Sequence, residues 1–437
     1  MNGTWSLDRQ PRCALTLLVL LSLATTGAAQ TATLITESGT GLPVMYPSYI
    51  TEYDGLLYFR GSTPPGGTDA ELWRSNGATA ERAADIVPGS TGSSPAYLAV
   101  YNGKLYFAAS TSGGTKLWQY ESSTGTASQA PGESSQASLP EELTVYGGIL
   151  YFRAFRSNIG VELWKFDGAN QTPVDIFPGS GSSYPQHFIQ YNGLLYFNAC
   201  GQVNQGTELW RTDGSAVTNA ATIYPNNGSS PEQMAVHNNA LYFSAYDGVH
   251  GRELWQYSGG SASLAADIVP GGQYSSSNPN GLTVYRDKLY FSANDGVHGY
   301  ELWCYDGNAA RMVVEINPTP DPGDGDTWMM DSSPMDLTVF DDVLYFSADD
   351  GVLGRELWSY DGNTARLVLD INRGQYGSGV SELTVYNGNL YFSADDGYVP
   401  GLMELVPKVW VLAVPEPATL GFLALGGLGI LARRRRG

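Results

Sequence analysis

The chain has few cysteines, few histidines and few basic residues, and each shortage narrows what it can be. Three cysteines in 437 residues are too few for a disulfide framework, so we expect them to be buried singly rather than paired. Four histidines leave little from which to build a zinc or copper site. Lys and Arg total 23 against 43 Asp and Glu, which disfavours nucleic acid as a partner because it requires a basic surface.

Long apolar runs are also absent, and the two that come closest lie near the ends of the chain. The C-terminal run, residues 420–432, has 13 residues, whereas a stable transmembrane helix needs about 20. A Pro-Glu-Pro motif precedes this run and an arginine cluster follows it: Pro415, Glu416 and Pro417, then Arg433, Arg434, Arg435 and Arg436. The positive-inside rule keeps the arginines in the cytoplasm, so the segment predicts a marginal membrane anchor with the rest of the chain exported.

This ending resembles the PEP-CTERM sorting signal of Gram-negative bacteria, which exosortase-type membrane enzymes recognise and cut. The resemblance covers residues 413–437. It implies export through the inner membrane to the cell surface or extracellular space, an exosortase-type partner, and a C-terminal helix that anchors the chain only until processing. The alternative is an ordinary single-pass tail anchor with a chance Pro-Glu-Pro sequence.

The N-terminus supplies an export signal. Arg9 and Arg12 precede an apolar run over residues 14–24, and Gly27-Ala28-Ala29 provides the small residues that signal peptidase requires. We therefore expect signal peptidase to remove residues 1–29. Loss of both signals takes the bases from 23 to 17 and the acids from 43 to 41, so the mature chain carries a net charge of about −24.

The body of the chain, residues 30–412, is one motif written eight times. A Leu-Tyr-Phe sequence marks each unit, and its leucines are Leu57, Leu105, Leu150, Leu195, Leu241, Leu289, Leu344 and Leu390. The intervals are 48, 45, 45, 46, 48, 55 and 46 residues, a period typical of propeller blades, solenoids or arrays. A Glu-Leu-Trp sequence follows in six units, at Glu71, Glu162, Glu208, Glu253, Glu301 and Glu356. Unit two has Lys116 in place of the glutamate, and unit eight decays to Glu404-Leu405-Val406.

Each unit contains signals for four short β-strands. In unit eight, residues 381–386 and 389–394 flank Asn387-Gly388, a strong hairpin signal because both turn residues need positive φ. The Glu-Leu-Trp segment predicts a third strand, and a fourth follows it, as at residues 366–371 of unit seven. Both faces of Leu-Tyr-Phe are apolar, so each sheet must be covered on both sides. We therefore predict an all-β fold, a β-propeller of four-stranded antiparallel blades.

We expect eight blades, closed by the N-terminal strand. Unit eight has no fourth strand of its own before the sorting tail, whereas residues 32–36 match residues 365–369, within the fourth strand of unit seven. The first strand of the mature chain is therefore predicted to complete the last blade, because a repeat of this kind buries both faces only in a closed set. A seven-bladed ring with a frayed last unit is the alternative.

Four units carry Glu-Leu-Trp-x-x-Asp-Gly intact, beginning at Glu162, Glu208, Glu301 and Glu356. These units resemble the ELWxxDGT repeat of large secreted bacterial proteins. The resemblance covers roughly residues 32–406 and concerns fold and compartment. Most proteins with this repeat have no assigned activity, so the resemblance implies no chemistry.

No catalytic constellation is evident in the sequence. The repeated glutamates recur at one equivalent position, which indicates one structural role, at a strand edge or in hydrogen bonding beside the tryptophan. His250 and His298 occupy one loop position in neighbouring units and lack a third metal ligand. No Gly-x-Ser-x-Gly elbow, His-Glu-x-x-His sequence or phosphate-binding loop occurs.

One loop with three carboxylates is the best candidate for a metal or ligand site. Asp321, Asp324 and Asp326 alternate with glycine in the long insertion of unit six, and Trp328 follows them. Oxygen ligands on a flexible turn suit Ca²⁺, although the full ligand spacing of a calcium loop is missing. A solvated acidic turn is the alternative, and no other cofactor is expected.

These observations predict a non-enzymatic propeller of the cell surface or extracellular matrix. Connections between second and third strands emerge on the same face as those between blades, and we expect that face to bind the ligand. The ligand is a glycan, such as an exopolysaccharide, or a surface protein. A secreted polysaccharide hydrolase or lyase is the alternative, and it requires non-repeated acid, Tyr, His or Arg residues at the channel mouth.

Overall fold

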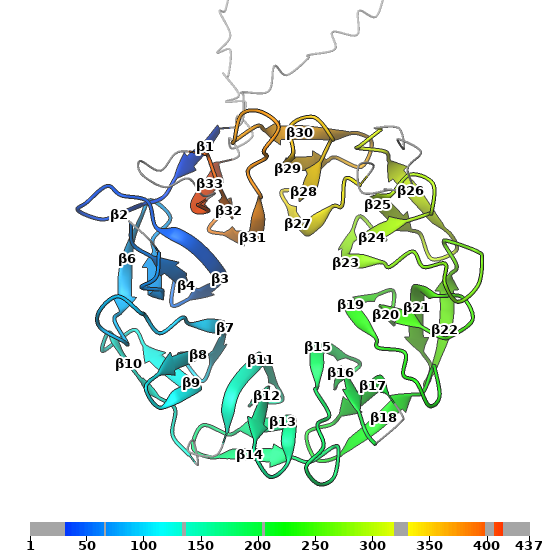
Figure 1. Ribbon diagram of the computed structural model, residues 1–437, viewed down its shortest axis with the longest axis horizontal. Helices are drawn as coiled ribbons and strands as arrows, with labels where there is room; N and C mark the ends of the chain where they lie inside the picture. Colours follow the sequence, from blue (N-terminus) through cyan, green and yellow to red (C-terminus); the bar gives the residue numbers. More distant parts are fainter. Residues whose placement is uncertain are drawn as a thin grey trace, which may run out of the picture.

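The computed structural model describes residues 31–64, 67–132, 137–202, 206–318, 331–397 and 406–413. Their strands form seven sheets, six with four strands and one with nine, arranged around a central opening (Figure 1). No helix occurs in this part of the chain. The architecture is therefore all-β and propeller-like, as the sequence predicts.

Each unit has strands at equivalent positions of its sheet. The innermost strands border the central opening: β3 (Met45–Tyr53), β7 (Ala96–Tyr101), β11 (Ser138–Tyr146), β15 (Gln186–Tyr191), β19 (Glu232–His237), β23 (Asn280–Tyr285), β27 (Met335–Phe340) and β31 (Ser381–Tyr386). The second strands carry Leu-Tyr-Phe: β4 (Leu56–Ser62), β8 (Lys104–Thr111), β12 (Ile149–Arg156), β16 (Leu194–Cys200), β20 (Ala240–Tyr246), β24 (Lys288–Asn294), β28 (Val343–Asp349) and β32 (Asn389–Ala394).

The outer half of each unit pairs with the second strand in the same antiparallel order. The third strands are β5 (Glu71–Ser75), β9 (Gly114–Glu121), β13 (Gly160–Phe166), β17 (Thr207–Thr212), β21 (Arg252–Ser258), β25 (Tyr300–Tyr305), β29 (Arg355–Tyr360) and β33 (Lys408–Ala413). The fourth strands of the first seven units are β6 (Thr79–Ala84), β10 (Thr126–Gln129), β14 (Gln171–Val174), β18 (Val217–Ala221), β22 (Ser261–Ala266), β26 (Ala310–Val314) and β30 (Ala365–Leu369).

The nine-stranded sheet contains both ends of the described chain. One run of four strands is β3 to β6, and the other is β31, β32, β33 and β1 (Thr31–Leu34). A single residue pair, Met45 opposite Lys408, joins the two runs, and the short strand β2 (Thr36–Glu37) lies parallel to β6. Leu34 of β1 lies opposite Trp410, as Leu367 of β30 lies opposite Trp358. The predicted register of the first strand is therefore present.

Leu-Tyr-Phe builds the core because its side chains alternate between the two faces of the sheet. In unit one, Tyr58 packs in one cluster with Leu105 and Phe107 of unit two. On the other face, Leu57 and Phe59 pack with the tyrosines of unit eight, including Tyr391. All of these side chains are at most 2 % exposed. Units eight and one thus contact each other in the same way as units one and two.

A tyrosine at the end of most innermost strands adds a second link between units. Its hydroxyl donates to a backbone carbonyl in the first turn of the next unit: Tyr53 to Gly103, Tyr101 to Gly148, Tyr146 to Gly193, Tyr191 to Asn239, Tyr285 to Asp342 and Tyr386 to Gly55. His237 and Phe340 occupy the position in units five and seven. We call these six residues the latch tyrosines.

One prediction about unit eight is wrong. Its third strand is not the segment around Glu404-Leu405-Val406 but β33, in which Trp410 lies opposite Phe392 as Trp73 lies opposite Phe59. Lys408 takes the position of the repeated glutamate. The motif does not reveal this strand because the strand keeps the tryptophan but has a lysine in place of the glutamate that marks the motif in six other units.

Lys408 is buried, and acidic neighbours compensate its charge. Its ammonium group forms an ion pair with Asp396 and lies 3.9 Å from the carboxylate of Asp395. Buried charges persist in proteins only when they are paired in this way.

Two further predictions can be compared with the described residues. Cys200 and Cys304 are free, as expected, but only Cys304 is buried, and Cys200 is partly exposed. In the part of the chain that the structure describes, no helix has the length and apolar character needed to cross a bilayer. The predicted signal peptide and C-terminal helix lie outside the described residues.

Candidate binding site in the central channel

The repeated glutamates of the third strands make structural hydrogen bonds. In unit five, Glu253 is buried and accepts bonds from the N–H of Ile268 (2.9 Å) and from the N–H and hydroxyl of Ser277 (2.9 and 2.5 Å). Backbone N–H groups and a serine hydroxyl serve the other members in the same way: Glu71, Glu162, Glu208, Glu301 and Glu356. These bonds tie each third strand to the connection into the next unit, which confirms the predicted structural role.

Burial opposes the charge of these carboxylates. Loss of hydration raises the pKa of Glu162, Glu253 and Glu356, although their hydrogen bonds favour the ionised form. The effect is largest in unit six, where burial raises the pKa of Glu301 to about 7. These groups serve the scaffold and do not face a ligand site.

The two loop histidines do not converge on a common site. Nδ1 of His250 lies 2.6 Å from Oδ2 of Asp247, and Nδ1 of His298 lies 2.7 Å from Oδ2 of Asp295. Each aspartate belongs to the same loop as its histidine, and its hydrogen bond raises the pKa of the imidazole. Each pair therefore closes its own loop.

Every innermost strand carries a bulge, and the bulged residue is one of six types among the eight units. It lies eight residues before the leucine of Leu-Tyr-Phe and has φ between 55° and 69°. We call these residues the bulge ring: Tyr49, Tyr97, Glu142, His187, Gln233, Gly281, Asp336 and Glu382. A positive φ is unfavourable for any residue except glycine, so its recurrence indicates a backbone geometry imposed by the fold. The side chains, by contrast, are not imposed by the repeat.

Members of the bulge ring link neighbouring innermost strands. A side-chain oxygen of one member accepts a hydrogen bond from the backbone N–H of the next: Glu142 from His187 (3.2 Å), Gln233 from Gly281 (3.1 Å) and Glu382 from Tyr49 (2.9 Å). The last of these bonds joins unit eight to unit one. The ring therefore contributes to the channel wall as well as to its chemistry.

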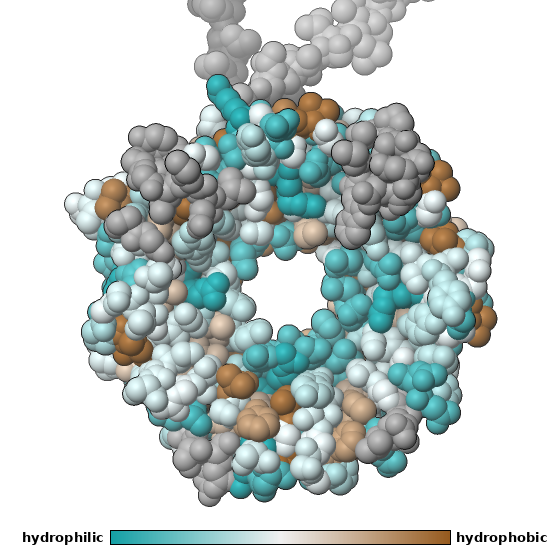
Figure 2. Space-filling view, viewed as in Figure 1, coloured by the Kyte–Doolittle hydropathy of each residue, from teal (hydrophilic) through white to brown (hydrophobic). Residues whose placement is uncertain are grey.

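The ring lacks a side chain at Gly281, and the channel wall is hollowed beside it. Two adjoining recesses of about 480 and 460 Å³ share Gln233, Asn280 and Met335. The first also has Glu232, Ser244, Arg252 and Tyr300 in its lining, and the second has His187, Gly281 and Asp336. We call the two together the channel recess. Figure 2 shows the open channel and the largely hydrophilic surface around it.

Polar groups in the channel recess are positioned but incompletely satisfied. Arg252 forms an ion pair with Glu232 (3.0 Å) and donates to the carbonyl of Ser230 (2.9 Å). The buried hydroxyl of Ser244 has no hydrogen-bond partner among the described residues. Desolvation by the channel wall raises the pKa of Asp336. A ligand that brings its own donors and acceptors would satisfy groups of this kind.

The recess is suited to a ligand rich in hydroxyl groups. Arg252 and Asn280 supply hydrogen-bond donors, Glu232 and Gln233 supply acceptors, and Tyr300 supplies an aromatic ring with a polar end. A few polar groups that converge in a concave site are typical of binding sites for small molecules and for single residues of a polymer.

The residues that the sequence singles out lie elsewhere. The sorting motif and the proposed calcium loop, including Asp321, Asp324, Asp326 and Trp328, fall outside the described residues, so both stay predictions. Within the described part of the chain, no group of three or more His, Cys, Asp and Glu is placed to hold a metal ion. The sequence does contain a signal for the bulge ring: alignment of the units on Leu-Tyr-Phe gives a mostly polar, variable column eight residues earlier, followed by a column that is apolar in every unit.

Comparison with known proteins identifies the tail but not the body. Residues 413–436 match the PEP-CTERM protein-sorting motif. No curated protein matches the chain. The chain is similar in structure to the β-propeller domain of the trilobed protease from Pyrococcus furiosus, with 11 % identity and a TM-score of 0.45 over 75 % of this chain and 99 % of that domain.

Two further structures are peptidases. A structure from an analysis of two prolyl endopeptidases gives 12 % identity and a TM-score of 0.49 over 81 % of this chain and 53 % of that chain. A puromycin-hydrolysing peptidase from Mycobacterium tuberculosis gives 11 % identity and a TM-score of 0.47 over 81 % of this chain and 58 % of that chain. This chain thus spans little more than half of either peptidase, and TM-scores below 0.5 carry no argument about its activity. The structure shows an all-β, propeller-like body, and the family comparison shows that the chain ends in a PEP-CTERM sorting motif, the mark of an exported protein sorted by an exosortase-type enzyme.

Proposed function

We propose that this protein is an exported, non-enzymatic propeller that binds a glycan in its channel recess. The observation that carries the proposal is the contrast between repeated and non-repeated residues. Repeated glutamates, tryptophans and tyrosines serve packing and hydrogen bonding, whereas the side chains that vary between units converge on the recess between units four and seven. Variation inside an otherwise uniform repeat marks the place where selection acts on binding.

We infer a closed ring of eight blades built from ELWxxDGT-type repeats. Strand β1 supplies the fourth strand of the last blade, which divides the nine-stranded sheet into two blades. A core cluster lies at each of the eight junctions, including the junction of units eight and one. The hydrogen bond from Tyr386 to Gly55 (2.6 Å) supports the same closure.

The route of the chain follows from its two terminal signals. Signal peptidase removes residues 1–29, and an exosortase-type enzyme of the inner membrane processes the tail at residues 413–437 after Pro415, Glu416 and Pro417 are recognised. The propeller then resides at the cell surface or in the extracellular matrix of a Gram-negative-type bacterium. Its acidic composition agrees with a neutral glycan as ligand and disfavours nucleic acid.

A polysaccharide hydrolase or lyase is the second candidate, and one observation favours it. Asp336 and Glu382 are neighbours in the bulge ring, and desolvation by the surrounding channel wall raises the pKa of both carboxyls, although the surface of Asp336 stays exposed to the channel. A carboxyl group with a raised pKa is what a general acid in glycoside cleavage requires. The hydrogen bonds that both carboxylates accept from backbone N–H groups favour a structural role instead.

A glycan array combined with an activity screen on exopolysaccharides tests the proposal. We expect the purified mature protein to bind one class of glycan and to leave every polymer intact, as judged by reducing-end and unsaturated-product assays. Turnover of any polymer that is lost in Asp336→Asn would establish the enzyme instead. Absence of binding to every glycan, with binding to an isolated surface protein, would replace the ligand class.

A further inference from the structure

The two ends of the described chain meet at one point of the fold. Strand β1 pairs antiparallel with β33, and Thr31 lies opposite Ala413. Ala413 is both the last residue of β33 and the first residue of the matched sorting motif. Thr31 comes two residues after the predicted signal-peptide boundary. The segments that the two processing enzymes are expected to cut therefore adjoin the same end of the β1–β33 strand pair.

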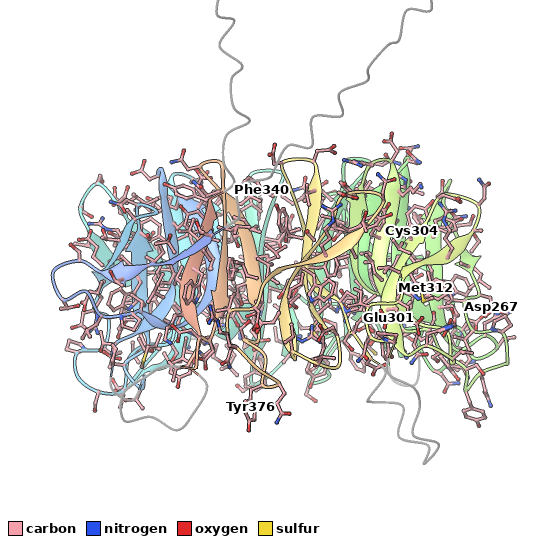
Figure 3. All side chains as sticks on the ribbon, turned by 90° about the horizontal axis from the view of Figure 1, so that it is seen from above. Asp267, Glu301, Cys304, Met312, Phe340 and Tyr376 are labelled. Carbon is pink, nitrogen blue, oxygen red and sulfur yellow. The ribbon has the colours of Figure 1, made fainter. Side chains whose placement is uncertain are left out.

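The strand pairing assigns this point to one face of the propeller. Leu412 lies opposite Leu390, near the start of β32, and Lys408 lies opposite Ala394 at its end. The C-terminal end of β33 is therefore beside the turn between first and second strands. We call the face formed by these turns, and by the turns between third and fourth strands, the junction face. The opposite face, formed by the remaining connections, is the outer face; Figure 3 shows Phe340 and Tyr376 on opposite sides of the molecule.

Little chain separates this strand end from either membrane segment. Seven residues lead from Thr31 back to the apolar run of the signal peptide, and seven lead from Ala413 to the run that begins at Leu420. Seven extended residues reach at most about 25 Å. Both membrane segments also place their arginines in the cytoplasm, so both join the fold from the same side of the membrane. The antiparallel pair meets this requirement because β1 runs away from the shared end and β33 runs toward it.

We propose that the unprocessed protein is held with its junction face against the inner membrane, where the processing enzyme meets it, and with its outer face directed away. The inference rests on the export and processing included in the proposed function. In this orientation the processing enzyme cuts at the edge of the folded propeller, within a few residues of paired strands. Any attachment through the new C-terminus keeps the same orientation.

This orientation exposes the surfaces that a ligand needs. The lining of the channel recess comes from the starts of innermost and third strands and the ends of second strands, such as Asn280, Tyr300 and Ser244, all near the outer face. The same face carries Tyr274 and Tyr376, which are 92 % and 78 % exposed. The channel recess is therefore accessible from the side opposite the membrane.

Labelling of single cysteines in a retained precursor tests the proposal. The full-length chain with Pro415→Ala, Glu416→Ala and Pro417→Ala is expressed in cells that process the parent chain. One variant adds Asn363→Cys, in an exposed turn of the junction face, and its matched control adds Tyr376→Cys on the outer face. Spheroplasts are treated with an impermeant polyethylene-glycol maleimide before and after release by mild detergent. The chain without added cysteine measures the background from Cys200.

We expect Tyr376→Cys to react at the same rate in both states and Asn363→Cys to react several-fold faster after release. Equal rates for Asn363→Cys before and after release would overturn the orientation while leaving export and processing intact. A precursor found in the soluble fraction would overturn the sorting step itself, and the orientation with it. Circular dichroism of the released variants shows whether each has kept the fold.

Discussion

The blades and the channel recess contain the same kinds of residue but use them differently. In the third strand of unit five, Glu253 is fully buried and accepts three hydrogen bonds, of which those from the isoleucine N–H and the serine hydroxyl recur in five other units. In the innermost strand of the same unit, Glu232 has a side chain 38 % exposed and pairs with Arg252 in the lining of the channel recess. The first glutamate maintains the fold, and the second is available to a ligand. Under the proposed function, carboxylates of the first kind stabilise the fold and those of the second kind bind the ligand.

Strand β1 and the residue that follows it should show the largest effect on stability, because they belong to the scaffold although they lie outside the repeat. Ile35 follows β1, is 1 % exposed and donates its N–H to the carbonyl of Val409 (2.9 Å). Ile35→Pro removes this bond and the buried side chain, so we expect a loss of more than about 3 kcal/mol in unfolding free energy. Urea denaturation followed by circular dichroism measures it, with exposed Thr40→Ala as the control. A loss below about 1 kcal/mol would mean that the ring does not depend on its N-terminal strand.

Substitution of Glu253 and of Glu232 in unit five tests this difference directly. Glu253→Ala leaves the N–H groups of Ile268 and Ser277 without their acceptor, so we expect a loss of about 3 kcal/mol in unfolding free energy. Glu232→Ala removes a partly exposed ion pair and should cost less than about 1 kcal/mol while weakening glycan binding. Denaturation and glycan-binding assays on both variants give the result. Equal losses of stability would remove the distinction between scaffold and site.

The dependence of unfolding free energy on pH should reflect the buried glutamates of the third strands. Because burial raises the pKa of Glu301 from 4.5 to about 7, the folded chain holds this proton more tightly than the unfolded chain. The contribution is therefore complete below about pH 4.5 and is lost as the pH rises through about 7, by roughly 3 kcal/mol. Glu301→Gln should flatten the dependence of unfolding free energy on pH in this window. Exposed Glu81→Gln is the control and should leave the slope unchanged.

The latch tyrosines should show the smallest effect. Tyr386→Phe removes the hydroxyl that donates to the carbonyl of Gly55, across the junction of units eight and one. We expect a loss of about 1 kcal/mol, the usual contribution of one partly buried hydrogen bond. Unit seven already has Phe340 at this position, so the fold tolerates the change. No loss relative to exposed Tyr376→Phe would show that the latch is dispensable.

The strands of the scaffold can be predicted from the sequence because the same buried residues recur in each unit. Leu-Tyr-Phe must bury both faces of a strand, which predicts covered sheets, and the match of residues 32–36 to the fourth strand of unit seven predicts the pairing of the first strand with the last unit. The strand at Lys408 was missed because one changed residue hid the motif.

The channel recess was missed for the opposite reason. Its residues differ between units, so no single unit marks them, and Gly281 has no side chain to attract attention. Their proximity depends on innermost strands that come from units about 46 residues apart in sequence. Only the arrangement of the blades brings His187, Gln233 and Asp336 to one recess.

Filling the recess is the most direct test of its role. Gly281→Gln restores a side chain at the one position of the bulge ring that lacks it, at φ +69° and with only Leu337 near the new Cβ. Gly103→Gln makes the same change at φ +72° in an open turn and serves as the control. Isothermal titration with the glycan selected on the array should show unchanged binding for Gly103→Gln and none for Gly281→Gln, with both variants folded. Undiminished binding by Gly281→Gln would contradict the assignment of the channel recess as the binding site.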